Sequence, residues 1–422
     1  MLKSNQKSNL SIKTSAPAKK IYMDYAASVL PNPSSIHILG VLEKRKLEKA
    51  RQEVATILGT LPQNIIFNSG GTESNNLAIQ GVVFAWHENN IRKIPHIITT
   101  NIEHPSVLET CKLLQKRKLA EISIIPVEEN GIVDPKKIRK EIKENTVLVS
   151  VMYANNEIGT IQPIREIAKE IRHYKKMRNS AEFSRVPARP AGGLGLGPDQ
   201  LENSLNFSSS TFPIFHTDAV QAVNYLDLNV EKLGVDLLSL SGTKIENSGR
   251  IGILFKKKNI QLVNIFGGGD QESGLRPGTE NVIDIVKFSN ALKVVEKNKE
   301  KENKRLIKLR NYFIEKLEKQ SVILNGSLEN RLPNNINITF PKIPSDLLVV
   351  ELSERGIMTS SKSACKSSNS DGSYVVKAIH PEIGKDIGGL RFSMGKNTTK
   401  KEIDITLRAL TEILKKLKKW YD

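Results

Sequence analysis

The chain has 422 residues, 39% of them hydrophobic, so it is long enough for two or three domains with substantial cores. Its formal net charge is +18, but lysine and glutamate are interleaved in its helical stretches, so we interpret most of the charge as solvated surface and disfavour nucleic-acid binding as a primary role. Its two cysteines exclude a disulfide framework, and no apolar run is long enough to cross a membrane.

The first segment, residues 1–20, is basic: it contains several lysines and no acidic residue, and it lacks the apolar stretch of a secretory signal. We expect a disordered tail on a cytoplasmic protein. An organelle-targeting segment is the alternative, which the absence of arginine from this stretch disfavours.

Strand-like and helix-like segments then alternate up to about residue 290. The expected strands are 64–67, 96–99, 122–127, 147–151, 214–218, 235–240 and 251–255, and the expected helices begin at Thr72, after Pro105 and at Pro163. This alternation predicts an α/β fold with a mostly parallel central sheet wrapped by helices. Functional groups in such a sheet lie at the carboxyl ends of its strands.

After about Val282 the pattern changes. The expected elements are a long Lys/Glu-rich helix, a strand at 335–340, a helix at 347–355, a Ser-rich loop at 359–373 and a final amphipathic helix at 401–420. We therefore predict a large domain over 48–285 and a smaller α+β domain over 286–422, with residues 21–47 packing on the smaller one. Residues 177–211 are rich in Gly, Pro and Ser and are expected to form an exposed, mobile insertion.

Two residues at neighbouring strand ends suggest shared chemistry. Asp218 ends one expected strand, where a carboxylate can hold a protonated pyridine nitrogen, and Gln221 follows it within reach of a ring oxygen. Lys244 follows the next strand, at the end of the run Ser241–Lys244. Its amine could form a Schiff base, and the hydroxyls of Ser241 and Thr243 could bind phosphate. Taken singly, Asp218 is equally consistent with a helix cap and Lys244 with a surface lysine. Their spacing, about one crossover unit, favours a common site.

Three further motifs follow expected strands. Residues 69–76 place glycines and a threonine at a helix start, which suits a phosphate, although a capped helix without a ligand is the alternative. His104 could stack on a planar ring or move a proton, or it could be an ordinary loop residue. Residues 155–159 offer amides for a ring oxygen or a carboxylate, or simply form a turn.

In this order, the motifs resemble those of the NifS/IscS-like cysteine desulfurases of the class V aminotransferase superfamily. The resemblance runs from about Ile21 to the last helix and rests on the blocks 22–27 (YMDYAA), 32–37 (NPSSIH), 70–76, 103–107, 155–160, 216–221, 241–244, 274–279 (GLRPGT), 363–365 (SAC) and 390–395 (LRFSMG). It implies a homodimer of fold-type-I subunits that uses pyridoxal 5'-phosphate to take sulfur from L-cysteine, leaving L-alanine. The sulfur would pass to an iron–sulfur scaffold protein or a tRNA-thiolating enzyme.

The resemblance also implies roles for individual residues. Lys244 would form the Schiff base and move the Cα proton, Asp218 would pair with the pyridine nitrogen, and His104 would stack on the ring. The other implied contacts are Gly71, Thr72, Ser241 and Thr243 with the cofactor phosphate, Thr279 with the phosphate in the neighbouring subunit, Asn156 and Gln221 with the cofactor's ring oxygen and the substrate, and Arg391 with the substrate carboxylate. No resident metal site is predicted.

The two cysteines receive different predictions. Cys365 lies in a Ser-rich loop between Lys362 and Lys366, whose positive charge favours the thiolate. We therefore expect Cys365 to attack the substrate sulfur and hold it as a persulfide, and its thiolate could also bind an iron–sulfur cluster transiently. Cys111 lies on a helical stretch and is expected to be a small buried apolar residue.

The chain departs from the family pattern close to Lys244. Thr243 replaces the usual histidine, and residues 245–250 replace a Gly/Pro-rich turn, placing Glu246 unfavourably near a phosphate unless its side chain points away. The helix that the family has after Ala27 is reduced to residues 28–31, and Lys362 replaces a glycine. The alternative functions are a selenocysteine lyase or another class V lyase, a cofactor-free sulfur-relay scaffold, and an RNA-binding protein.

Overall fold

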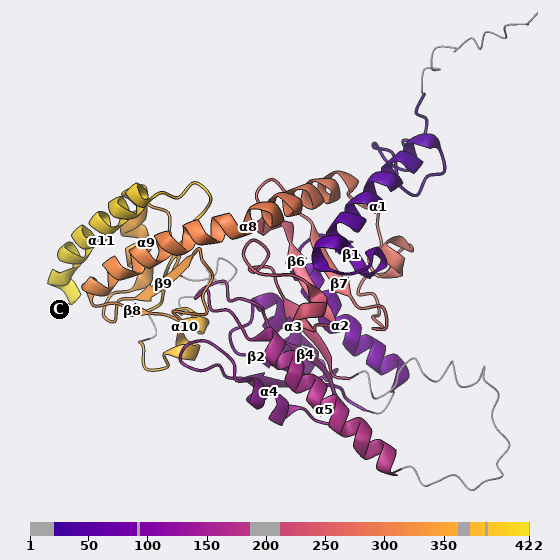
Figure 1. The fold of residues 1–422 in the computed structure, drawn as a ribbon, viewed down its shortest axis with the longest axis horizontal. Coiled ribbons are helices and arrows are strands. Elements are labelled where there is room, and N and C mark those ends of the chain that lie inside the picture. The colour runs from indigo at the N-terminus through magenta and orange to yellow at the C-terminus, as the bar shows by residue number, and fades with distance from the viewer. Residues whose placement is uncertain (1–20, 91–92, 186–211, 362–371, 385–386, 422) are drawn as a thin grey trace, which may run out of the picture.

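The computed structural model describes residues 21–90, 93–185, 212–361, 372–384 and 387–421. It shows two sheets connected by one long helix (Figure 1). The helices are α1 (Ile38–Leu58), α2 (Gly71–Asn89), α3 (Pro105–Lys116), α4 (Pro135–Glu141), α5 (Ile164–Arg185), α7 (Val230–Leu233), α8 (Val282–Leu317), α9 (Ser345–Ser353), α10 (Tyr374–Ile379) and α11 (Lys400–Tyr421). The strands are β1 (Ile65–Asn68), β2 (His96–Thr100), β3 (Glu121–Ile125), β4 (Thr146–Ser150), β5 (Ile214–Asp218), β6 (Leu237–Ser241), β7 (Gly252–Lys256), β8 (Ile323–Leu324), β9 (Asn335–Thr339) and β10 (Leu390–Ser393).

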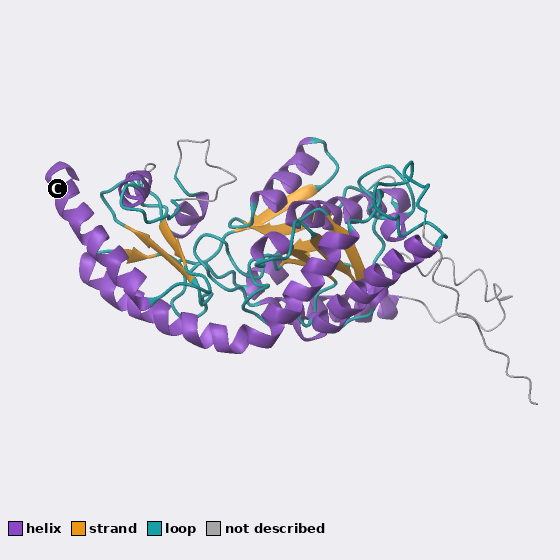
Figure 2. Ribbon diagram, turned by 90° about the horizontal axis from the view of Figure 1, so that it is seen from above, coloured by secondary structure: helices purple, strands orange, loops and turns teal. Residues whose placement is uncertain are grey.

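The larger sheet has seven strands in the order β1-β7-β6-β5-β4-β2-β3. The strands from β6 to β3 are parallel to one another, and β7 runs antiparallel to both of its neighbours. Helices cover both faces of this sheet (Figure 2), which explains why its central strands are buried along their whole length. The predicted α/β fold with a mostly parallel sheet is therefore confirmed.

One buried histidine links three central strands of this sheet. His216 on β5 lies with Nδ1 2.8 Å from the hydroxyl of Ser150 on β4 and with Nε2 3.0 Å from the hydroxyl of Ser239 on β6. Complete burial lowers the pKa of His216 to about 3, so the ring is neutral near pH 7. A polar residue therefore fits within an otherwise apolar layer because neighbouring strands supply both of its hydrogen-bond partners.

The smaller sheet is antiparallel, with strand order β10-β9-β8. Its core is formed with the second half of α8 and with α9 and α11, and it includes Phe313, Ile338, Leu352 and Phe392. This α+β unit falls within residues 286–422, and its amphipathic last helix buries one face, including Leu410 and Ile413, in the same core.

Helix α8 belongs to both units. It is 36 residues long, which corresponds to about 54 Å. Phe288 and Leu292 pack in the core of the large sheet, whereas Leu306 and Phe313 pack in the core of the small one. A boundary at residue 285 falls inside this helix, so the division into domains stays a prediction.

The amino-terminal helix α1 lies beside the first half of α8, at the end of the molecule far from the smaller sheet (Figure 1). Leu47, Val54 and Leu58 form its buried stripe and join the core of the large sheet. Within this chain the helix therefore packs on the large unit, where the sequence reasoning placed residues 21–47 with the smaller one. Residue 47 follows the rest of the helix into this core, because Leu47 lies on the same face as Val54 and Leu58.

Two further differences from the expectations concern connections. Helix α5 continues to Arg185, so residues 177–185, the first part of the expected insertion, are helical. They can form helix because they contain no Gly or Pro; the first proline after them is Pro187. Residues 186–211 lie outside the described part of the chain. The short elements α4, α7, α10, β8 and β10 were not predicted. None of the described helices is long and apolar enough to cross a membrane.

Candidate functional site

The carboxyl ends of several strands meet at one edge of the large sheet. Strand β1 runs in the same direction as β6, because β7 is antiparallel to both, so the segments that follow β1, β2, β4, β5 and β6 converge. They form a cavity of about 640 Å³, which loops of the smaller unit close from the other side. Its lining includes Gly71, Thr72, His104, Asn156, Asp218, Gln221, Ser241, Thr243, Lys244 and Arg391, all of them predicted site residues.

One end of the cavity suits an anion. The N-cap of α2 is Gly70, which supplies no side chain to the first turn, so the helix amino terminus faces the cavity with uncapped N–H groups. A Cβ atom on Gly71 would lie 2.8 Å from a methyl group of Val220 and 3.4 Å from Cβ of Ser241, so a larger residue there would require Val220 to move. The hydroxyls of Ser241 and Thr243 lie 2.9 Å apart beside this turn. These groups match the predicted phosphate site.

A carboxylate lies at the buried side of the cavity. Asp218 is 6% exposed, accepts a hydrogen bond from the N–H of Val220 at 3.0 Å and another from the amide of Asn75 at 2.7 Å. Both of these donors are neutral groups. A buried carboxylate requires a cation or several hydrogen-bond donors. A protonated pyridine nitrogen would supply Asp218 with both a positive charge and a further donor. The residues present therefore fit pyridoxal phosphate.

Lys244 is exposed within the cavity and follows β6 on a single 3₁₀ turn. Its carbonyl oxygen accepts a hydrogen bond from the side-chain amide of Asn224, which holds the turn in place. The neighbouring Glu246 points away: its carboxylate is mostly exposed and lies 3.7 Å from the amine of Lys396, and it does not line the cavity. The acidic residue that was expected to disfavour a phosphate is thus directed elsewhere.

A guanidinium group lies opposite, on the smaller unit. Arg391 of β10 donates a hydrogen bond to the carbonyl oxygen of Asn156 at 2.8 Å, and its Nε is buried with no hydrogen-bond partner in the described chain. Burial lowers its pKa, and the nearby carboxylate of Glu157 opposes that shift. Since this guanidinium forms no ion pair among the described residues, it has donors available for a substrate carboxylate.

Both flanks of the predicted cysteine loop contact this region. Ser360 pairs with Arg391 through two backbone hydrogen bonds, of 2.7 and 3.3 Å. On the other flank, Ser373 donates to the carboxylate of Glu157, and the Tyr374 hydroxyl donates to the carbonyl oxygen of Glu103. Cys365 itself lies in 362–371, outside the described residues.

Other predicted residues fall outside the cavity. Thr279 is exposed and does not line it. Cys111 is fully buried in an apolar cluster, and burial raises the pKa of its thiol to about 12, which confirms the expected structural role. The sequence reasoning missed Asn75 and Ser106, which line the cavity and bond to each other. Both lie within quoted motifs, but the sequence does not show which side chains of a motif turn inward.

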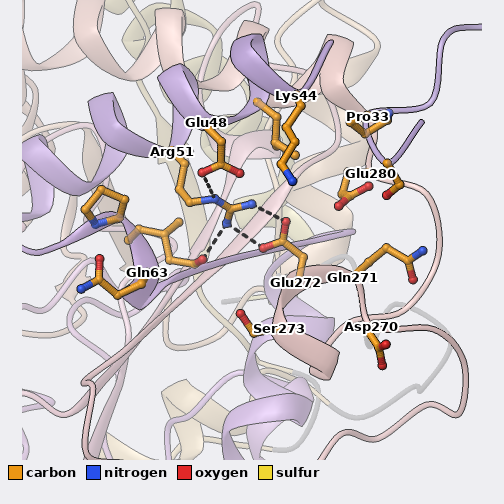
Figure 3. Close-up of a pocket in the computed structure, with 14 residues that line it drawn as sticks. Pro33, Lys44, Glu48, Arg51, Gln63, Asp270, Gln271, Glu272, Ser273 and Glu280 are labelled. Atoms are coloured by element: carbon orange, nitrogen blue, oxygen red, sulfur yellow. Dashed lines mark hydrogen bonds and ion pairs between the residues drawn. The ribbon is translucent and has the colours of Figure 1, made fainter. Parts of the chain in front are cut away.

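A second cavity, of about 670 Å³, lies between α1 and the segment 270–280 (Figure 3). Its floor is a buried ion pair in which two nitrogens of Arg51 donate to the two carboxylate oxygens of Glu272 at 2.7 and 2.8 Å. The same carboxylate accepts from the N–H of Phe67 on β1. The pair therefore ties α1 and β1 to the 3₁₀ turn η5 (Gln271–Gly274), from which the chain continues to Thr279.

Comparisons with known proteins agree with this geometry. Residues 3–178 and 210–406 match the family described as aminotransferase class V, and the unmatched stretch between them falls within the expected insertion. The chain is 38% identical to the cysteine desulfurase IscS of Dictyoglomus turgidum, over 95% of this chain and 96% of that one. Among solved structures it resembles a NifS-like protein (TM-score 0.76, 31% identity, 91% of each chain) and SspA in complex with cysteine (TM-score 0.65, 29% identity, 86% and 90%).

Proposed function

Because the chain belongs to the aminotransferase class V family, which depends on pyridoxal 5'-phosphate, we propose that it is a cysteine desulfurase that converts L-cysteine to L-alanine and a protein-bound persulfide. The observation that supports this most directly is the single cavity lined by Lys244, Asp218 and Arg391 together with the start of α2. These groups match the cofactor aldehyde, the pyridine nitrogen, the substrate carboxylate and the cofactor phosphate, respectively.

Each residue has a defined task in this proposal. When bound, pyridoxal phosphate supplies an electron-accepting ring conjugated to the substrate Cα. Asp218 keeps the pyridine nitrogen protonated, and Arg391 fixes the substrate by its carboxylate. The amine of Lys244 takes up and returns the Cα proton. The thiolate of Cys365 attacks the substrate sulfur, so that an S–S bond forms as the C–S bond breaks. The electron pair of the broken bond stays on Cβ, which gains the proton that the substrate thiol loses, and the carbon product leaves as alanine.

The test starts with absorption spectra of the purified protein with pyridoxal phosphate, followed by measurement of alanine and sulfide after L-cysteine is added. We expect Lys244→Ala to reduce turnover by about 10³-fold or more. Cys365→Ser is expected to keep the cofactor absorption and its change on cysteine binding but to lose sulfide release. Cys111→Ala is the matched control, because Cys111 lies in an apolar cluster away from the cavity. Full sulfide release by Cys365→Ser would refute the persulfide role.

The same measurements separate the alternatives. Release of selenide from selenocysteine without release of sulfide from cysteine would indicate a selenocysteine lyase. A colourless protein that binds no pyridoxal phosphate would indicate a cofactor-free sulfur-relay scaffold, for which Thr243 and the short segment 28–31 are the motivation. The sulfur acceptor, an iron–sulfur scaffold or a tRNA-thiolating enzyme, and the cytoplasmic location stay predictions.

We also propose that two copies of the chain associate. Large apolar side chains of the amino-terminal segment are exposed, among them Met23 at 90% and Ile36 at 98%. Exposed large apolar side chains concentrated in one short segment favour an interface. In addition, Thr279 is exposed and does not line the cavity of its own chain, which is consistent with a contact to the phosphate of a second subunit.

A further inference from the structure

A chain of hydrogen bonds links the two residues that face the predicted cofactor ring. Asn75 on α2 is 1% exposed, and its side-chain nitrogen lies 2.7 Å from Oδ2 of Asp218 and 2.8 Å from the hydroxyl of Ser106. The hydroxyl of Ser106 in turn lies 2.8 Å from Nδ1 of His104. An amide nitrogen has two hydrogens, so Asn75 can donate to both neighbours at once.

The direction of each bond in this chain follows from the carboxylate. If the amide of Asn75 were turned over, its oxygen would face Oδ2 of Asp218, an acceptor against an acceptor, so the nitrogen must point there. Ser106 then accepts from Asn75, and its own hydroxyl hydrogen remains to be donated to Nδ1 of His104. Asn75 therefore donates to Ser106, and Ser106 donates to His104.

The backbone adds a second donor at the same ring nitrogen. The N–H of Ser106 donates to Nδ1 of His104 at 3.1 Å, because His104 is the N-cap of α3. A backbone amide can only donate, so Nδ1 must hold a lone pair and the ring proton lies on Nε2. An imidazolium would set its own Nδ1–H against the backbone N–H of Ser106, which can only donate.

The surroundings of His104 shift its pKa in opposite directions. Burial lowers the pKa of His104 most strongly, Asp218 opposes that shift, and Lys244 adds to it. A pyridine ring protonated beside Asp218 would also repel an imidazolium stacked on it, whereas a neutral ring stacks without this cost.

We propose that Asn75 and Ser106 are positioning residues that hold His104 as the neutral ring protonated on Nε2 and couple that state to the carboxylate of Asp218. The placement of the proton follows from the geometry alone, whereas its effect on turnover rests on the proposed desulfurase function. The catalytic residue is His104; Asn75 and Ser106 act through it.

The direct test is ¹⁵N NMR of the holoenzyme labelled in its histidine rings, with the His104 signals assigned by their absence in His104→Gln. We expect the two ring nitrogens of His104 to show the shifts of a neutral ring with the proton on Nε2 at pH 7. A proton on Nδ1, or a doubly protonated ring at that pH, would overturn the proposal. This measurement requires no turnover, so it stays decisive even if the desulfurase assignment fails.

The second test is the pH profile of kcat/KM for alanine formation from cysteine. Ser106→Ala removes one donor to Nδ1, so the pKa of His104 should rise and the acidic limb should move upward by roughly one pH unit. Ser106→Thr retains a hydroxyl and should restore the wild-type limb. Asn75→Ala should move the limb in the same direction, and the double variant should shift it less than the sum of the single shifts, because both residues act through one chain of bonds.

Thr110→Ala is the matched control. Thr110 lies one turn further along α3, and its hydroxyl bonds to the carbonyl oxygen of Ser106 and the side-chain oxygen of Asn76. The acidic limb of the Thr110→Ala profile should stay at the wild-type position. An equal shift in Thr110→Ala, or an unshifted limb in Ser106→Ala, would overturn the proposal, since either result would show that the hydroxyl of Ser106 does not control His104.

Discussion

Glu103, the neighbour of His104, is a fully buried carboxyl group whose ionisation should set part of the pH dependence of stability. One oxygen accepts hydrogen bonds from the Thr100 hydroxyl at 2.7 Å and the N–H of Met152 at 3.0 Å. The other is buried and has no hydrogen-bond partner in the described part of the chain. Burial raises the pKa of Glu103 to about 8. The folded protein therefore holds a proton at neutral pH that the unfolded chain releases.

The sign of the effect follows from this proton. Between the ordinary carboxyl pKa of 4.5 and the folded value of about 8, unfolding releases a proton, so raising the pH destabilises the fold, and above pH 8 the penalty is constant. Glu103→Gln keeps an acceptor for Thr100 and Met152 without ionising. Its free energy of unfolding should equal that of wild type near pH 5 and exceed it by up to about 4 kcal/mol at pH 9. Denaturant titrations of both proteins, loaded with pyridoxal phosphate, measure this difference; parallel curves would contradict it.

The site residues that the sequence predicts best are those that directly follow strands. Asp218, Lys244 and His104 occupy such positions, and parallel topology brings strand ends together whatever the details of packing. Asn75 and Ser106 were missed, because both lie on helices and only the packing of α2 against α3 reveals which of their side chains meet. Glu246 shows the converse, since its distance from the phosphate site depends on the conformation of one turn.

At the scale of elements, the pair of Arg51 and Glu272 should be one of the most sensitive contacts in the large unit. The two residues are 9% and 8% exposed and are 221 positions apart in the chain, so local sequence patterns could not reveal them. Glu272 and Ser273 both have positive φ angles, 48° and 59°, which is unfavourable for residues other than glycine. The ion pair therefore stabilises a turn that its own residues disfavour.

Removal of one member of this pair leaves a buried charge without a partner. We expect Glu272→Gln to lower the free energy of unfolding by about 3 kcal/mol, and Arg51→Met together with Glu272→Met to cost less than the sum of the single changes. Urea unfolding curves of the single and double variants measure these values. Glu300→Gln is the control, because its ion pair with Lys304 is exposed and should contribute nothing measurable. Additive costs in the double variant would show that the pair is not coupled.

Element boundaries were predicted where the sequence contains a clear start or end signal, such as proline, and missed where it contains none. The start of α3 follows from Pro105, which suits the first position of a helix. Helix α5 extends past its expected end, because the residues after Lys176 favour helix and the Gly/Pro-rich composition begins only near Pro187. The partner of α1 could not be predicted either, since an apolar stripe shows that a helix is buried but not which sheet covers it.

At the scale of the whole molecule, the position of Thr279 makes a prediction about two subunits. Lys244 and Arg391 line the same cavity of one chain, whereas Thr279 lies outside it. If Thr279 binds the phosphate in a second subunit, a mixed dimer of a Lys244→Ala chain and a Thr279→Ala chain contains one site with both defects and one intact site. With random pairing of equal amounts, about a quarter of all sites should then be intact.

Co-expression of the two variants with different affinity tags, and assay at limiting pyridoxal phosphate of the doubly tagged dimers, in which half of the sites should be intact, measures this recovery. The control is the mixture of Lys244→Ala with Arg391→Ala, in which each site of the mixed dimer lacks one essential group of its own chain, so no activity should return. Recovery in the first mixture but not in the second requires Thr279 to act across the interface. If the first mixture is no more active than the Thr279→Ala subunits it contains, then Thr279 acts within its own chain or not at all, and the proposed pairing of subunits around the cavity is wrong.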